Sequence, residues 1–205
     1  EFRRVLFRSD DISEKIVDKV IFKPKTNDEL QEAVDLWYTN RQKAINNYGD
    51  ISTWDTLLIT DMCSLFEDKV NFNDDISNWN VSNVTDMSGM FHGAELFNQH
   101  LNKWDVSRVK YMHNMFYKTY SFNQPLNNWN ISNVKNIGFM FSSAVSFNQP
   151  LNNWDVSNVT SMIGMFYGAE SFNQPLNKWD VSNVRDISYM FRNATSFNQP
   201  LNNWD

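Results

Sequence analysis

The sequence has a single cysteine, Cys63, among 205 residues, which excludes an internal disulfide framework and a zinc site built from cysteines. It has 18 Lys and Arg residues against 24 Asp and Glu residues, a net charge of -6. No basic stripe is therefore expected to bind nucleic acid. No apolar run approaches the roughly 20 residues of a membrane-spanning helix. The first residues, 1–9, do not resemble a secretory signal peptide.

Large apolar residues, by contrast, recur at a fixed interval. Tryptophans follow one another every 25 residues, at Trp54, Trp79, Trp104, Trp129, Trp154, Trp179 and Trp204. A fixed period of this length across most of a chain predicts one supersecondary unit that is stacked many times.

One unit reads LNNWDVSNVTSMIGMFYGAESFNQP over residues 151–175, and Leu151 is taken as position 1. Apolar positions 4 and 6 flank a polar position 5, which predicts a short strand. Apolar positions 9, 12, 15, 16 and 19 have helical spacing, and Ser-Asn at positions 7 and 8 is typical of a helix N-cap. Proline at position 25 ends the helix. The pattern predicts an α/β solenoid of strand–turn–short helix coils.

The residues Leu151, Trp154, Val156, Val159 and Met162 resemble the LxxLxL core of leucine-rich repeats, with Trp in place of the second Leu. The longer unit WDVSNVTSMIGMFYGAESFNQPLN resembles the bacterial surface protein repeat of about 25–26 residues found in the BspA-like leucine-rich repeat group. This resemblance implies a right-handed leucine-rich-repeat-like solenoid, a cell-surface or extracellular location, and a role in protein binding or adhesion. It carries over no catalytic residue.

The resemblance covers residues 51–205, where one departure from ordinary leucine-rich repeats is found. The asparagine ladder of those repeats would fall at position 9, which is Val in this chain. We expect Asn at position 23 to bond the backbone of the return loop instead.

Three zones divide the chain. Residues 1–20 form an aperiodic tail, part of which we expect not to be native to the protein. Residues 21–50 are expected to form an N-terminal cap with one helix over residues 27–46, begun by a capping box of Thr26 and Glu29. Residues 51–205 form the repeats, which end part-way through a unit and so predict that the protein continues.

Two sets of residues are candidates for binding. Positions 10, 11, 13, 14, 17, 18 and 20 vary between units and carry tyrosine and arginine, types that are favoured at binding hot spots. This set includes Tyr111, Tyr117, Tyr120, Phe139, Tyr167, Tyr189 and Arg192. Position 5 carries Asp105, Asp155 and Asp180 on the expected strand face, where they form either a polar ladder or a binding strip.

No set of residues predicts catalysis. The histidines His92, His100 and His113 occupy different positions of the unit, and the repeated Ser at position 7 has no His beside it. We expect no enzyme, no cofactor and no metal site. The favoured function is a non-enzymatic protein-binding or adhesion module, whose partner is a protein or a glycan. The alternatives are a glycan-binding or glycan-active β-solenoid that uses the Asp/Asn face, and a passive spacer. The oligomeric state is not predicted.

Overall fold

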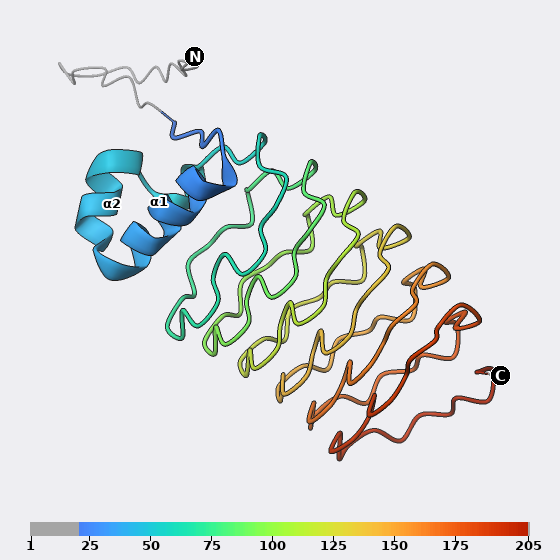
Figure 1. The fold of residues 1–205 in the computed structure, drawn as a ribbon. Helices are drawn as coiled ribbons and strands as arrows, with labels where there is room; N and C mark the ends of the chain where they lie inside the picture. The colour runs from blue at the N-terminus through green and yellow to red at the C-terminus, as the bar shows by residue number, and fades with distance from the viewer. Residues whose placement is uncertain (1–20, 205) are drawn as a thin grey trace, which may run out of the picture.

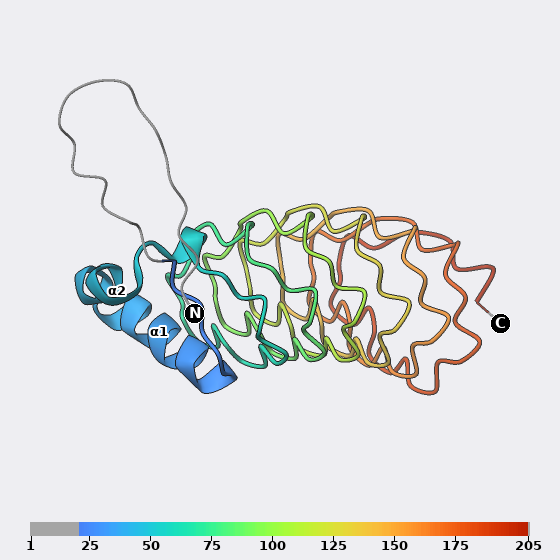
Figure 2. The ribbon, with the colours of Figure 1, turned by 90° about the horizontal axis from the view of Figure 1, so that it is seen from above.

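The computed structural model describes residues 21–204. Two helices lie at one end, and the remaining chain winds into coils that are stacked along one axis (Figure 1). Seen from above, the stack is an elongated body with the helices at one end and the last coil at the other (Figure 2). The predicted aperiodic tail, residues 1–20, lies outside the described residues.

Two helices precede the coils, α1 (Asn27–Thr39) and α2 (Arg41–Tyr48), and one short 3-10 turn, η1 (Ile51–Thr53), begins the first coil. The sequence predicts one helix over residues 27–46, whereas the chain breaks at Asn40. Asn40 has φ -149° and ψ 78°, which is not helical, and its side chain accepts the N–H of Lys43 at 3.1 Å to begin α2. Asn40, which lies inside the single predicted helix, therefore ends α1 and caps α2.

The first helix begins at the capping box that the sequence predicts. The Thr26 hydroxyl accepts the backbone N–H of Glu29 at 3.1 Å, and the Glu29 carboxylate accepts the backbone N–H of Lys25 at 2.6 Å. The apolar side of α1 is buried, namely Leu30, Ala33, Val34 and Trp37.

Helix α1 packs on the first coil through rings and ion pairs. The ring centroids of Trp37 and Trp54 are 5.9 Å apart, edge to face. Lys69 lies 2.7 Å from Asp35 of α1, and Arg41, the first residue of α2, lies 2.6 Å from Asp74. The helix thereby covers apolar surface that no preceding coil covers.

Each coil takes 25 residues and is built from a series of tight turns. In the coil over residues 151–175, the N–H of Trp154 donates to the carbonyl of Leu151 at 3.0 Å, and the N–H of Val159 donates to the carbonyl of Val156 at 2.8 Å. Such bonds from residue i to residue i-3 recur at positions 1–4, 6–9, 12–15, 14–17, 16–19 and 19–22.

The expected α/β, leucine-rich-repeat-like solenoid of strands and short helices is therefore wrong. Within residues 54–204 the structure contains no helix and no strand, and the β-pairing between coils is limited to isolated parallel bridges such as Tyr111–Asn136. Positions 4 to 6 lie between two turns, which leaves too short an extended segment for a strand.

Two observations explain why positions 9 to 19 do not form a helix. The N–H groups at positions 12, 14, 16 and 18 donate to the next coil, as Met112 does to Asn136 (3.0 Å) and Phe116 does to Met140 (2.9 Å). Positions 14 and 18 also have positive φ in every complete coil, including at Phe139 with φ 54°. A right-handed helix allows neither.

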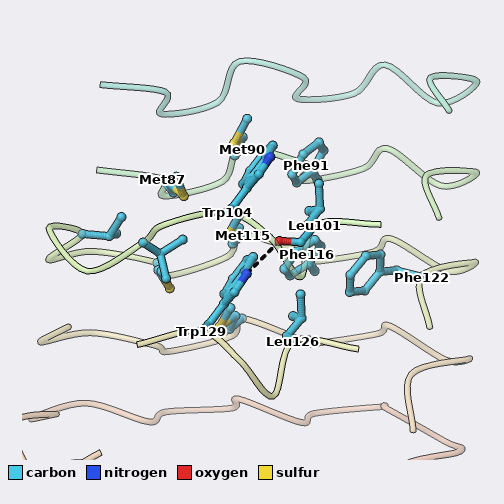
Figure 3. Close-up of a cluster of buried hydrophobic side chains, with 14 of the residues drawn as sticks. Met87, Met90, Phe91, Leu101, Trp104, Met115, Phe116, Phe122, Leu126 and Trp129 are labelled. Atoms are coloured by element: carbon cyan, nitrogen blue, oxygen red, sulfur yellow. Dashed lines mark hydrogen bonds between the residues drawn. The ribbon is translucent and has the colours of Figure 1, made fainter. Parts of the chain in front are cut away.

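The core consists of aromatic columns that run along the stack (Figure 3). The rings of Phe116 and Phe141, one coil apart, are 5.6 Å apart and parallel within 1°, and Phe116 also lies 4.1 Å from Phe122 of its own coil. Trp129 and Trp154 are 6.5 Å apart at 2°. Each such pair contributes about 0.5–1.5 kcal/mol beyond the burial of its area.

The buried indole N–H groups are satisfied between coils. Trp129 Nε1 donates to the carbonyl of Leu101 in the preceding coil at 2.9 Å (Figure 3), and the same carbonyl accepts the backbone N–H of Trp104 at 3.0 Å. The tryptophan column is thus both a packed column of rings and a column of hydrogen bonds.

The predicted asparagine ladder at position 23 is confirmed. The side-chain oxygen of Asn98 accepts the backbone N–H of Asn123 at 3.0 Å, and that of Asn123 accepts the N–H of Asn148 at 3.0 Å. The sequence interpretation missed the glutamine at position 24, since Gln124 and Gln149 also donate to this ladder at 3.0 Å. Each internal Asn therefore bonds two groups of the next coil.

Candidate binding surface

The aspartates at position 5 cap the turn that follows them. The carboxylates of Asp105, Asp155 and Asp180 accept the backbone N–H of the serine two residues later, at 3.0, 3.1 and 3.1 Å. The side-chain and backbone hydrogen bonds of Ser107 lower the pKa of Asp105, and the Arg108 guanidinium lowers it further.

The hydrogen bonds of Ser182 likewise lower the pKa of Asp180. These carboxylates are exposed and belong to separate coils, and each one closes its own turn. In the described part of the chain, no group of three His, Cys, Asp or Glu side chains could hold a metal ion. The geometry gives the aspartates a role in the turns.

The outward residues at positions 14, 17 and 18 of the coils form a second surface, which we call the turn face. Tyr117 and Tyr167 stand at position 17, and Phe139 and Tyr189 stand at position 14. These four are the predicted site residues that lie on it. Tyr111 at position 11 and Tyr120 at position 20 lie outside it.

Arg192 joins two of the predicted tyrosines into one cluster. Its guanidinium carbon lies 5.9 Å from the ring centroid of Tyr167 in the preceding coil and 5.6 Å from that of Tyr189 in its own coil. The side-chain amide of Asn193 reaches the Tyr167 hydroxyl at 3.5 Å. Tyr189 is 59% exposed, so the cluster presents aromatic and cationic groups to solvent.

A second cluster on the turn face surrounds Tyr117. The ring of His92 lies 4.8 Å from the ring of Tyr117, and His92 Nδ1 lies 2.9 Å from a carboxylate oxygen of Glu67. The Lys118 ammonium lies 5.2 Å from the Tyr117 ring centroid. The sequence interpretation did not include Glu67, His92 and Lys118 among the candidate binding residues. The available signal was that they stand at positions 17 and 18, which vary between the repeats.

Phe139 differs from the tyrosines because its ring is used inside the stack. A Cβ added to Gly164, the residue at position 14 of the next coil, would overlap the Phe139 ring. The ring therefore covers the space that Gly164 leaves free, and Phe139 is half-buried. We assign it to packing between coils.

One hollow in the described chain lies beside the helices. It is a pocket of about 560 Å³, lined by Phe22, Lys23, Lys25, Glu29, Glu32, Tyr48 and Leu58. None of the predicted site residues lines it. Among residues 21–204, no helix has both the length and the apolar character needed to cross a membrane.

Comparison with known proteins gives one match. A family model described as "Mycoplasma protein of unknown function, DUF285" matches residues 34–149 and 126–205. The predicted resemblance to a repeat family of unknown function agrees with this match, whereas the finer resemblance to BspA-like surface proteins stays a prediction. No curated protein and no solved structure gives a significant match.

Proposed function

Since the chain belongs to the DUF285 family of Mycoplasma proteins of unknown function, we propose a function from its surface: it is a non-enzymatic module that binds proteins, of the adhesion type, at a cell surface. The turn face supports this proposal. The observation that carries it is the cluster of Tyr167, Tyr189 and Arg192.

This cluster has the chemistry of a binding hot spot. Tyr and Arg are enriched where protein interfaces gain most of their free energy, because each combines a large contact area with a polar end. The two cation–π contacts hold the Arg192 side chain between the rings, so less side-chain entropy is lost when a partner binds. The backbone beneath is fixed by bonds between coils, such as that from Gly168 to Arg192 at 2.8 Å.

The non-enzymatic part of the proposal is supported by a serine–histidine contact between two coils. Ser88 Oγ lies 2.9 Å from His113 Nδ1, but Ser88 is only 3% exposed. A nucleophile must be reached by its substrate, and this hydroxyl is covered. The pair spans two coils at the same position, which favours a role in holding them together.

Alanine variants of the turn face test the proposal. Extracts of cell-surface proteins are passed over the immobilised chain. Bound proteins are identified for the unchanged chain, for Tyr167→Ala with Tyr189→Ala, and for Asn153→Ala. Asn153 is an exposed residue at position 3, outside the turn face, and serves as the matched control. We expect one partner to be retained by the unchanged chain and by the control and to be lost by the double variant.

The alternative outcomes are equally definite. If glycosidase treatment of the extract abolishes retention, or if the control variant loses the partner and the double variant keeps it, the turn-face proposal is wrong. A glycan-binding Asp/Asn face would then explain the result better.

A further inference from the structure

Side chains at the corner of a coil, positions 8 to 11, can bond the backbone of the preceding coil and of their own turn. In the coil over residues 76–100, Asn83 donates to the carbonyl of Leu57 at 2.9 Å, and the Thr85 hydroxyl donates to the carbonyl of Thr60 at 3.3 Å. The Asp86 carboxylate accepts the N–H of position 13 at 2.8 Å. Asn, Thr and Asp are thus the residues that build this corner.

The next coil, residues 101–125, departs from this pattern at all three places. It has Arg108 at position 8, Lys110 at position 10 and Tyr111 at position 11. Arg108 bonds the Asn83 side chain at 2.7 Å, and Tyr111 has no carboxylate or amide oxygen to close the turn. All three side chains are exposed, Tyr111 by 45%.

A further lysine, Lys135, occupies position 10 of the following coil. Its backbone N–H donates to the carbonyl of Lys110 at 2.8 Å, so the two lysines stand in direct register. Like charges in such register are unfavourable. Within the described chain, no carboxylate lies within ion-pair distance of Arg108, Lys110 or Lys135. The fold does not require lysine at position 10, because Thr160 fills this position with a hydroxyl that bonds at 3.1 Å. The Lys135 ammonium donates one hydrogen bond, to the side-chain oxygen of Asn158 at 3.3 Å, which leaves its charge without a carboxylate partner.

We infer that Arg108, Lys110, Tyr111 and Lys135 form a site, the basic corner, that binds an acidic peptide segment of a protein partner. Three cations without carboxylate partners in a chain of net charge -6 are complementary to a short run of carboxylates. The exposed Tyr111 ring offers apolar contact beside them. This inference does not depend on the proposed function, since the basic corner shares no residue with the cluster at Arg192.

Charge also selects a peptide over a long polyanion. Arg108 lies close enough to Asp105 to affect its carboxyl, and Asp155 and Asp180 follow along the stack on that side. A nucleic acid or sulfated polysaccharide that crossed several coils would meet these aspartates. A short acidic peptide can be accommodated on the two coils that carry the cations.

Exchange of the corner between coils tests the site. The variant Arg108→Asn, Lys110→Thr and Tyr111→Asp gives residues 101–125 the corner of residues 76–100. Because it restores the bonds that build the corner, it is expected to melt no lower than the unchanged chain. Binding is followed by the fluorescence anisotropy of a labelled oligoglutamate peptide, with labelled oligolysine as the control probe, at low and at physiological salt.

We expect oligoglutamate to bind more tightly than oligolysine and its affinity to fall with salt. The corner variant should bind oligoglutamate roughly tenfold more weakly, since two cations and one exposed ring are lost and one carboxylate is gained. The reverse exchange, Asn158→Arg with Thr160→Lys and Ser161→Tyr, should strengthen binding.

Three results would overturn the inference. The first is unchanged affinity of the corner variant for oligoglutamate. The second is displacement of the peptide by heparin or single-stranded DNA at lower concentration than by unlabelled oligoglutamate, which would point to a polyanion site. The third is loss of oligoglutamate binding in the variant Tyr167→Ala with Tyr189→Ala, which would place the site on the turn face.

Discussion

Replacing Gly164 by alanine would show how closely the outer turns of neighbouring coils fit together. Gly164 has φ +56°, and a Cβ at this residue would lie 2.5 Å from Cδ1 of Phe139 and nearer still to Cε1. A left-handed backbone costs an alanine about 1–2 kcal/mol, and overpacking costs about 1–3 kcal/mol. We therefore expect Gly164→Ala to lower the free energy of unfolding by about 2–5 kcal/mol.

Two further variants separate these contributions. In a Phe139→Gly background the overlap disappears, so Gly164→Ala should then cost only the backbone term of about 1–2 kcal/mol. Gly168→Ala is the matched control in the same coil. Its φ is +65°, but its added Cβ would come no nearer to Ser143 than 3.5 Å, at Oγ, which is an ordinary contact.

Unfolding in urea, followed by tryptophan fluorescence, measures these differences because the repeated tryptophans from Trp54 to Trp179 are buried in the core. Circular dichroism should give the same midpoint, which checks that the stack does not unfold in parts. If Gly164→Ala cost no more than Gly168→Ala, or cost the same with and without the Phe139 ring, the packing described here would be wrong.

Other predictions concern the ladders and the turns. Asn123→Ala should lower the free energy of unfolding by about 1–3 kcal/mol, because it leaves part-buried N–H groups of the next coil unbonded. The control is Asn198→Ala, whose side-chain oxygen accepts no bond within the described chain. It should lower the free energy of unfolding by less in the same urea titration. Trp129→Phe removes one buried hydrogen bond and part of a ring, so it should lower the free energy of unfolding by about 1–3 kcal/mol and lower the melting temperature accordingly. An unchanged melting temperature would contradict the assigned bond. The hydrogen bonds of Ser107 hold the pKa of Asp105 below its unfolded value, so Asp105 stabilises the fold above about pH 4 and this contribution is lost as the pH falls through the lowered pKa. Ser107→Ala should therefore lose less stability between neutral and acid pH than the unchanged chain, and a steeper loss would refute the assignment.

The period and the buried positions could be predicted from the sequence, but the local structure could not. The apolar spacing at positions 9, 12, 15, 16 and 19 is the same for a short helix and for a series of turns that returns its side chains to one side. The difference lies in the backbone at positions 14 and 18. Gly89, Gly93, Gly164 and Gly168 mark these positions in two coils, and their interval of four residues was the available signal of left-handed turns.

The candidate surface was predicted at the level of positions, not of contacts. Variable positions with Tyr and Arg indicated where exposed Tyr189 and Arg192 and half-buried Tyr167 would reach the surface. Their clustering could not be predicted, because it depends on where the side chain of one coil meets that of the coil 25 residues later. Phe139 shows the same limit, since only the glycine that faces it reveals its packing role.

The bonds at position 23 also constrain how the length of such a chain can change in evolution. The side-chain oxygen of an Asn at position 23 accepts the backbone N–H of the residue 25 positions later, as Asn123 does from Asn148. The indole N–H at position 4 donates to the carbonyl of the residue 28 positions earlier, as Trp129 does to Leu101. Gain or loss of a whole number of units preserves every one of these separations, while insertion of a single residue inside a coil displaces all the groups that follow it. Recombination between units is therefore the route by which this architecture can lengthen or shorten, and it carries exposed residues such as Tyr189 and Lys110 along as interchangeable parts.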